Sequence, residues 1–245
     1  MPLEHVALVS TALFLASALY ATVGHGGASA YLAILALTGE INSSARPTVL
    51  AMNVVVASIA AFHFTRVGAF SPRLFLPLAT TSVPLAYLGG RLSPSESLFR
   101  DALGVALVVA ALRSFMDSTT DEGELEVPSV PLLATAGGSL GFASGLVGVG
   151  GGIFLSPLLL LRRWADARSV SGVAAVFIVV NSLAGLTGAL QSGGELHAAL
   201  PLWLASVVIG GWFGAAHGSR HLDRRGLRQV LSVVLVMAAA KMFLT

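Results

Sequence analysis

The sequence predicts an all-α polytopic membrane protein made of two inverted repeats. Each repeat is expected to be a broken or re-entrant helical hairpin followed by three transmembrane helices. Three observations lead to this fold: an apolar composition, a glycine cluster at matching places in the two halves, and an uneven distribution of arginine and lysine. Of the 245 residues, 55% are hydrophobic and only 11% are charged, whereas a soluble domain has about 25% charged residues. We therefore reject a soluble all-α domain.

The charges and residue types exclude several classes of protein. The net charge is only +2, and the basic residues lie in short loops between apolar segments. This distribution is typical of membrane topology signals and not of a nucleic-acid-binding surface. The chain has no cysteine, which excludes disulfides, thiolate metal sites and cysteine nucleophiles. We expect no cofactor and no metal. The N-terminus lacks the basic region of a cleaved signal peptide, so the first apolar segment is expected to stay in the mature protein.

The first repeat is predicted to span residues 1–116. Its hairpin consists of apolar segments at 5–23 and 28–38, which meet at Val23-Gly24-His25-Gly26-Gly27-Ala28. A helix needs about 20 residues to cross the hydrocarbon core, so the second segment is too short to cross alone. We prefer a hairpin that turns back within the membrane to two full crossings with one very short arm. Spanning helices are expected at 47–65, 72–90 and 98–116.

The second repeat is predicted to span residues 129–245, after an acidic cytoplasmic linker at 117–128. Its hairpin has arms at 129–147 and 153–162, separated by Val147-Gly148-Val149-Gly150-Gly151-Gly152. Gly24 and Gly148 are 148 − 24 = 124 residues apart, about half the chain. Spanning helices are expected at 168–189, 197–217 and 227–244. Matched helix breaks inside hydrophobic segments indicate a transporter built from repeats.

The charged residues predict the orientation of the chain. A hairpin plus three crossings is an odd number, so the second repeat begins on the opposite side and must be inverted. Both termini are then expected outside the cell, in a bacterial cytoplasmic (inner) membrane. The outer side would carry four basic residues, which are Arg46, Arg91, Arg100 and Lys241. The cytoplasmic side would carry ten, which are Arg66, Arg73, Arg113, Arg162, Arg163, Arg168, Arg220, Arg224, Arg225 and Arg228.

The glycine breaks are predicted to form an anion site near the membrane midplane. Unwound backbone at that depth is tolerated only where it is buried in protein or lines a wet cavity. The helix that follows each break presents free N–H groups and the positive end of its dipole. Packing alone is the alternative, because Gly141-x3-Gly145 and Gly148-x3-Gly152 also let helices approach closely. The candidate substrate-binding residues are Gly24, His25, Gly26, Gly27, Ala28, Ser29, Tyr31, Asn53, Gly148, Gly150, Gly151, Gly152 and Asn181.

Polar side chains at or near the breaks have two interpretations each. His25 is a candidate proton carrier or anion donor, or a neutral histidine bonded to a carbonyl. Asn53 and Asn181 either join helices or orient a ligand. Arg46 and Arg168, at the starts of matching helices, either attract anions at an entrance or extend to the membrane interface.

The glycine motif of the second half resembles the signature of the TauE/SafE sulfite exporter (TSUP) family. The likeness rests on Gly148-x-Gly150-Gly151-Gly152-x4-Pro157-Leu158 and on Asn181-Ser182-Leu183-Ala184-Gly185-Leu186-x-Gly188. The first-half copy departs from it, since His25 interrupts the glycines and Ala28 and Ala33 replace the third glycine and the proline. The resemblance implies outward transport of small sulfur-containing anions such as sulfite, sulfoacetate or related organosulfonates.

We therefore expect an alternating-access anion transporter and not an enzyme. A passive anion channel, or a carrier of a different small organic anion, is the alternative. An intramembrane enzyme is disfavoured because the chain has no cysteine, no His-Glu-x-x-His spacing and no deeply placed Ser/His/Asp set. The expected partners are a small anionic substrate, the lipid bilayer and protons as a candidate coupled ion, with no nucleic acid. A homodimer is compatible with the sequence.

Overall fold

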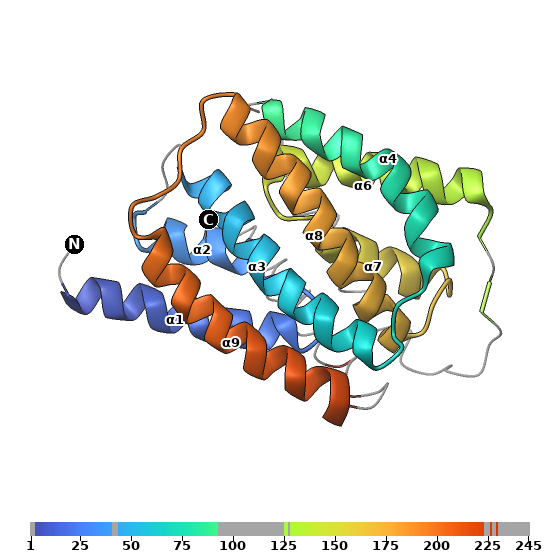
Figure 1. Cartoon of the computed structure of the whole chain (residues 1–245), viewed down its shortest axis with the longest axis horizontal. Coiled ribbons are helices and arrows are strands. Elements are labelled where there is room, and N and C mark those ends of the chain that lie inside the picture. Colours follow the sequence, from blue (N-terminus) through green and yellow to red (C-terminus); the bar gives the residue numbers. More distant parts are fainter. Residues whose placement is uncertain are drawn as a thin grey trace.

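The computed structural model describes residues 3–40, 44–92, 125–126, 128–222, 226 and 229. Within these residues, all the named elements are α-helices (Figure 1). The predicted spans 98–116 and 227–244, and most of the linker at 117–128, lie outside the described residues. The helices are α1 (Leu3–Ala21), α2 (Ala28–Leu37), α3 (Ala45–Arg66), α4 (Pro72–Arg91), α6 (Val130–Val147), α7 (Gly152–Leu161), α8 (Ala167–Gln191) and α9 (Leu200–His221).

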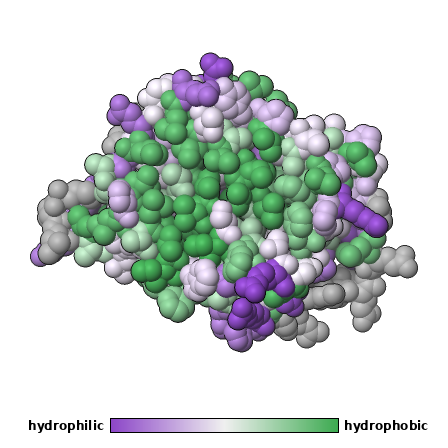
Figure 2. Space-filling view, in the orientation of Figure 1, coloured by the Kyte–Doolittle hydropathy of each residue, from purple (hydrophilic) through white to green (hydrophobic). Residues whose placement is uncertain are grey.

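The helix lengths confirm a polytopic membrane protein with two short hairpin arms. Helices α1, α3, α6, α8 and α9 are long and apolar enough to cross a membrane, whereas α4, with two internal prolines, does not meet that standard. The arms α2 and α7 have ten residues each, or about 15 Å of helix against about 30 Å of hydrocarbon. Figure 2 shows apolar side chains over the centre of one face and hydrophilic ones at its edges, as lipid contact requires.

Helix boundaries follow from local chemistry. Asp166 caps α8, because its carboxylate accepts the N–H groups of Arg168 and Ser169 at 2.9 and 3.2 Å. Pro72 begins α4, where a missing N–H costs nothing. Helix α6 ends at Gly148, whose left-handed conformation closes the last turn.

Helices α3 and α8 form the centre of the molecule and run antiparallel (Figure 1). At one end, Thr48 near the start of α3 accepts the backbone N–H of His197, which follows α8. At the other end, the backbone of Ala69, after α3, lies against Gly172 near the start of α8. Asn53 and Ser182, in the middle of each helix, therefore meet at the same depth.

Rows of glycines hold the two halves together on both flanks of this central pair. Helix α6 of the second half packs on α4 of the first, and α9 of the second half packs on α1 of the first (Figure 1). A Cβ added at any glycine of these rows would lie 2.3 Å or less from a carbonyl oxygen of the facing helix. The rows are Gly137, Gly141 and Gly145 against Leu78, Ser82 and Ala86, and Gly210, Gly214 and Gly218 against Phe14, Ala18 and Thr22. Gly141 and Gly145 thus allow close helix packing, which was the alternative interpretation to an anion site for these glycines.

Two buried apolar clusters enclose the hairpin arms. One includes Tyr31 and Leu35 of α2 with residues of α1, α3 and α9, and the other includes Leu155 and Leu159 of α7 with Phe177 of α8. Inside a bilayer this packing replaces lipid contacts with closer contacts between protein side chains. Both arms begin at buried residues, Ala28 and Gly152, whereas α2 ends at Leu37, which is 76% exposed.

Candidate functional site

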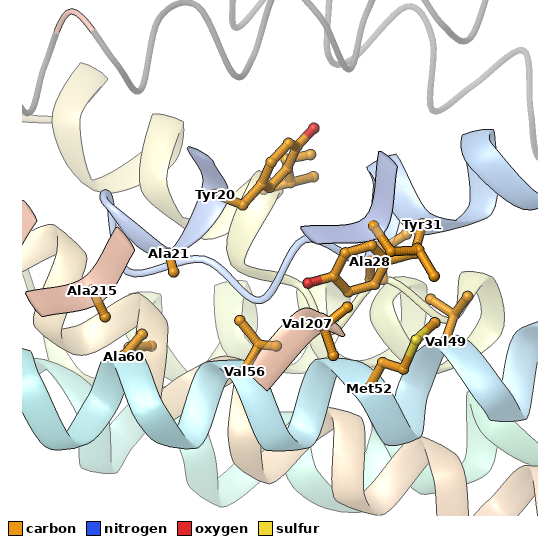
Figure 3. Close-up of a cluster of buried hydrophobic side chains, with 14 of the residues drawn as sticks. Tyr20, Ala21, Ala28, Tyr31, Val49, Met52, Val56, Ala60, Val207 and Ala215 are labelled. Atoms are coloured by element: carbon orange, nitrogen blue, oxygen red, sulfur yellow. The ribbon is translucent and has the colours of Figure 1, made fainter. Parts of the chain in front are cut away.

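The first break is a short unwound segment that lies beside α3 (Figure 3). Helix α1 ends at Ala21, and the chain turns through positive φ values of 79° at Gly24 and 93° at Gly27 before α2 begins at Ala28. The turn is closed by the N–H of His25, which donates to the carbonyl oxygen of Tyr20 at 3.0 Å. Only glycine adopts such φ values without strain.

The second break has the same construction at the matching place. Gly148, Gly150 and Gly151 have φ values of 83°, 73° and 80°, and α7 begins at Gly152. The N–H of Gly148 donates to the carbonyl oxygen of Ser144 at 2.9 Å. The structure thus confirms two helix breaks at the predicted glycine clusters, and both lie in buried surroundings.

Asn53 of α3 connects the two breaks. Its Oδ1 accepts the backbone N–H of Ala28, at the start of α2, at 3.3 Å. Its Nδ2 donates to Ser182 Oγ of α8 at 2.8 Å and lies 3.5 Å from the carbonyl oxygen of Val149, inside the second break. One buried side chain therefore joins the first hairpin, the second hairpin and the opposite central helix.

His25 makes a second connection between the breaks. Its Nδ1 lies 3.2 Å from the carbonyl oxygen of Val23, and its Nε2 lies 3.1 Å from Ser156 Oγ of α7. In the neutral tautomer with the proton on Nδ1, the ring donates to the Val23 carbonyl and Nε2 accepts from the Ser156 hydroxyl. A second proton on Nε2 would reverse this hydrogen bond and force the hydroxyl to find another acceptor.

The second break also presents donors that have no acceptor. Among the described residues, the N–H groups of Gly150, Gly151 and Ile153 donate no hydrogen bond. Ser144 Oγ is fully buried without a partner, and it would lie 3.3 Å from a Cβ placed on Gly151. Buried polar groups are normally satisfied, so a free hydroxyl beside free N–H groups offers hydrogen bonds to a polar ligand.

The remaining predicted residues divide into those at the breaks and those apart from them. Ser29 lies 3.1 Å from the Tyr20 hydroxyl, and the ring of Tyr31 packs against Gly27, so both belong to the first break. Asn181 does not reach the breaks in this conformation: its Nδ2 donates to the carbonyl oxygen of Phe177 in its own helix, and its Oδ1 has no partner.

Three serines also lie at the breaks, and none of them was among the predicted substrate-binding residues. Ser182 bonds Asn53, Ser156 bonds His25, and Ser144 lies against Gly151. Each is fully buried. The signal available in the sequence was weak, because a single serine in an apolar helix is also common as a donor to its own backbone.

Arg46 and Arg168 both bind backbone carbonyls of neighbouring helices. The guanidinium of Arg46 donates at 2.6–3.0 Å to the carbonyl oxygens of Gly89, Gly90 and Leu92 at the end of α4, and of Gly145 in α6. That of Arg168 donates at 2.7 Å to the carbonyl oxygen of residue 219 in α9. Cations at helix C-termini are stabilised by the helix dipole.

Comparisons with known proteins identify the family. The family model described as "Sulfite exporter TauE/SafE" matches residues 9–242. The chain belongs to the TauE/SafE family. It is also 37% identical over 238 residues to the "Probable membrane transporter protein y4hK" of Sinorhizobium fredii, with 96% of each chain covered. No solved structure matches.

TauE/SafE membership makes the chain a membrane transporter, in agreement with its apolar spans. The sequence-based recognition of the family is thereby confirmed. Among the described residues, no group of three or more His, Cys, Asp or Glu side chains is placed to hold a metal ion. The chemistry that the site offers is therefore hydrogen bonding by N–H groups, hydroxyls, one amide and one imidazole.

Proposed function

We propose that this transporter carries small sulfur-containing anions, such as sulfite or organosulfonates, and that the anion binds between the two glycine breaks. The observation that carries the proposal is the set of free N–H groups at the second break beside the unpartnered Ser144 hydroxyl. Helix N-termini attract anions without any basic side chain. Outward transport across the bacterial inner membrane is the expected direction.

Alternating access between inverted repeats is the proposed mechanism. Three relations among the described helices support it: α3 runs antiparallel to its counterpart α8, α4 runs parallel to α6, and α1 runs parallel to α9. Arg46 and Arg168 join the start of a central helix to the end of the next helix, so each central helix is antiparallel to its successor. Helices α1, α3 and α4 then run opposite to their counterparts α6, α8 and α9, as rocking about a central site requires.

His25 is the proposed proton carrier if transport is coupled to protons. It lies in the first break and contacts Ser156 beyond the second, so its protonation changes a hydrogen bond between the two hairpins. With α1, α3 and α9 parallel, the start of α3 faces outside and the start of α8 faces the cytoplasm in the proposed orientation. Arg46 and Arg168 then lie on opposite sides of the site.

A ligand screen tests the substrate class. The purified protein is heated with sulfite, sulfate, thiosulfate, taurine or sulfoacetate, and its melting temperature is followed. A ligand at 100 times its dissociation constant stabilises the folded protein by about 2.7 kcal/mol. The sulfur-anion proposal would be contradicted if a carboxylate without sulfur raised the melting temperature while none of these five compounds did.

Substitution of Gly151 tests the position of the site. Gly151→Val should abolish anion binding, because a side chain there meets Phe177 and Ser144. Since Gly151 has a positive φ, Gly151→Ala is the milder variant and Gly193→Ala is its control: Gly193 has a φ of 86° and open space around it. Both alanine variants carry the same backbone strain. Only a loss of anion affinity that occurs in Gly151→Ala and not in Gly193→Ala supports anion binding at the second break.

A transport assay distinguishes a carrier from a channel. Counterflow of labelled anion in liposomes supports a carrier, and large unitary currents would show a channel.

A further inference from the structure

The side-chain amide of Asn53 fills the space between the two breaks. A Cβ on Gly26 would lie 1.9 Å from Asn53 Oδ1, and a Cβ on Gly150 would lie 2.3 Å from Asn53 Nδ2. Real Cβ atoms essentially never approach another atom closer than 3.0 Å. Glycine at both positions is therefore what allows the amide to lie between the hairpins, where only 1% of Asn53 is exposed.

The Asn53 oxygen occupies the position at which an anion oxygen would bind the first hairpin. It accepts the N–H of Ala28, the first residue of α2, and so caps the positive end of that helix dipole. The bond is long, at 3.3 Å, and the acceptor is neutral. A charged oxygen makes shorter and stronger hydrogen bonds of about 2.7–2.9 Å, so an anion should compete successfully for the same N–H.

The Asn53 nitrogen binds the other half of the protein. It donates to Ser182 Oγ at 2.8 Å and reaches the carbonyl of Val149 at 3.5 Å. An amide group is planar, so its oxygen and nitrogen move together. Displacement of Oδ1 from Ala28 must therefore also disturb the bonds from Nδ2 to the second half.

We propose that the Asn53 amide is an internal substitute for the transported anion, which holds the hairpins together when no anion is bound. Binding of the anion displaces the amide and releases the connection between the halves. A ligand can shift a conformational equilibrium only if it binds one of the two conformations more tightly than the other. Here the anion binds the conformation in which the Asn53 amide no longer links the hairpins, because it replaces the hydrogen bond that the amide makes in the empty site. This inference rests on the proposed function and adds a role for one residue within it.

Two substitutions that should change anion affinity in opposite directions test the proposal. Asn53→Ala removes the competing acceptor, so sulfite, thiosulfate or sulfoacetate should bind about three- to tenfold more tightly, the equivalent of one ordinary hydrogen bond. Asn53→Asp places a tethered carboxylate at the same N–H, so the same anions should bind at least about tenfold more weakly. Affinity is measured by titration of the intrinsic tryptophan fluorescence of the full-length protein in nanodiscs.

Hydrogen exchange gives a second measurement that needs no ligand. Peptides that cover residues 24–30 and 148–153 should exchange about tenfold faster in Asn53→Ala than in wild-type protein. Ser58→Ala is the matched control, because Ser58 lies on the exposed face of the same helix and its hydroxyl bonds only Val54 of that helix. The control should exchange at the wild-type rate.

The outcomes separate this inference from the proposed function. If the wild-type protein binds the anions and both Asn53 variants bind them more weakly, Asn53 is a direct ligand. That result would overturn this inference and leave the proposed function in place. Faster exchange with unchanged affinity would show a purely structural link and also overturn it, as would exchange equal to that of wild-type protein. Absence of binding of all three anions to the wild-type protein would refute the proposed function and, with it, the substitute role of the amide.

Discussion

Replacement of Gly26 by alanine tests the geometry between the breaks most directly. Gly26 is not in the left-handed region, so alanine should cause no backbone strain there. Its Cβ would nevertheless lie 1.9 Å from Asn53 Oδ1 and 3.0 Å from the carbonyl oxygen of Asn53. To restore a 3.0 Å contact, Oδ1 must retreat by at least 3.0 − 1.9 = 1.1 Å.

The cost of this movement follows from the contacts that it breaks. A retreat of Oδ1 lengthens its 3.3 Å bond to Ala28 beyond hydrogen-bonding distance, and it pushes Nδ2 against Ser182 and Gly150. Overpacking of a core costs about 1–3 kcal/mol, and a lost hydrogen bond costs about 1 kcal/mol. Together these give about 2–4 kcal/mol, or a decrease in melting temperature of about 4–16 °C for a chain of this size.

A double-mutant cycle with Asn53→Ala isolates the contact. In that background the side-chain atoms that collide with the new Cβ are absent and only the backbone carbonyl at 3.0 Å remains. Gly26→Ala should then cost less than about 1 kcal/mol, giving a coupling energy of about 1–4 kcal/mol between the two positions. The melting temperature can be followed by the fluorescence of the three tryptophans. An equal decrease from Gly26→Ala with and without Asn53 would refute the contact and the argument built on it.

Three further predictions concern contacts elsewhere. Arg46→Ala removes the guanidinium donor from four carbonyls, of which that of Gly89 keeps the N–H of Leu92, and should destabilise by about 2–4 kcal/mol. Arg168→Ala removes the donor from one carbonyl and should cost about half as much in the same melting assay; an equal loss would contradict the prediction. Gly214→Leu places a Cβ 2.0 Å from the backbone of Ala18 and should prevent recovery of folded, monodisperse protein. His25→Ala should reduce anion flux into liposomes and change its pH profile, and wild-type flux at every pH would remove His25 from the mechanism.

The positions of the breaks could be predicted from sequence because each glycine inside a continuous helix costs about 1 kcal/mol relative to alanine. A cluster of glycines in an apolar segment therefore favours an interruption of the helix. The ten-residue arms were equally predictable, because their length excludes a crossing by itself. Arg46 and Arg168 show the limit of this reasoning. Their place at the starts of helices is visible in the sequence, but the carbonyls that they bind lie at the ends of other helices.

The side chains that complete the site could not be chosen from sequence. Asn53 and Asn181 lie at similar depth in matching helices, yet one joins both hairpins and the other bonds its own helix. Their difference depends on which face of each helix meets the glycines, and the apolar pattern of a central helix, buried on several sides, does not indicate a face. Ser182 rather than Asn181 contacts Asn53 for this reason.

The pairing of α1 with α9 has a consequence for biosynthesis. Phe14 rests on Gly210, and 210 − 14 = 196 residues separate them in the chain. At about 5–20 residues per second, the ribosome needs on the order of 10–40 s to produce the partner of the first helix. Throughout that time the groove that receives the glycine row must be covered by lipid or by the insertion machinery. Helix α1 thus acquires α9 as a packing partner only after the six described helices between them have been synthesised.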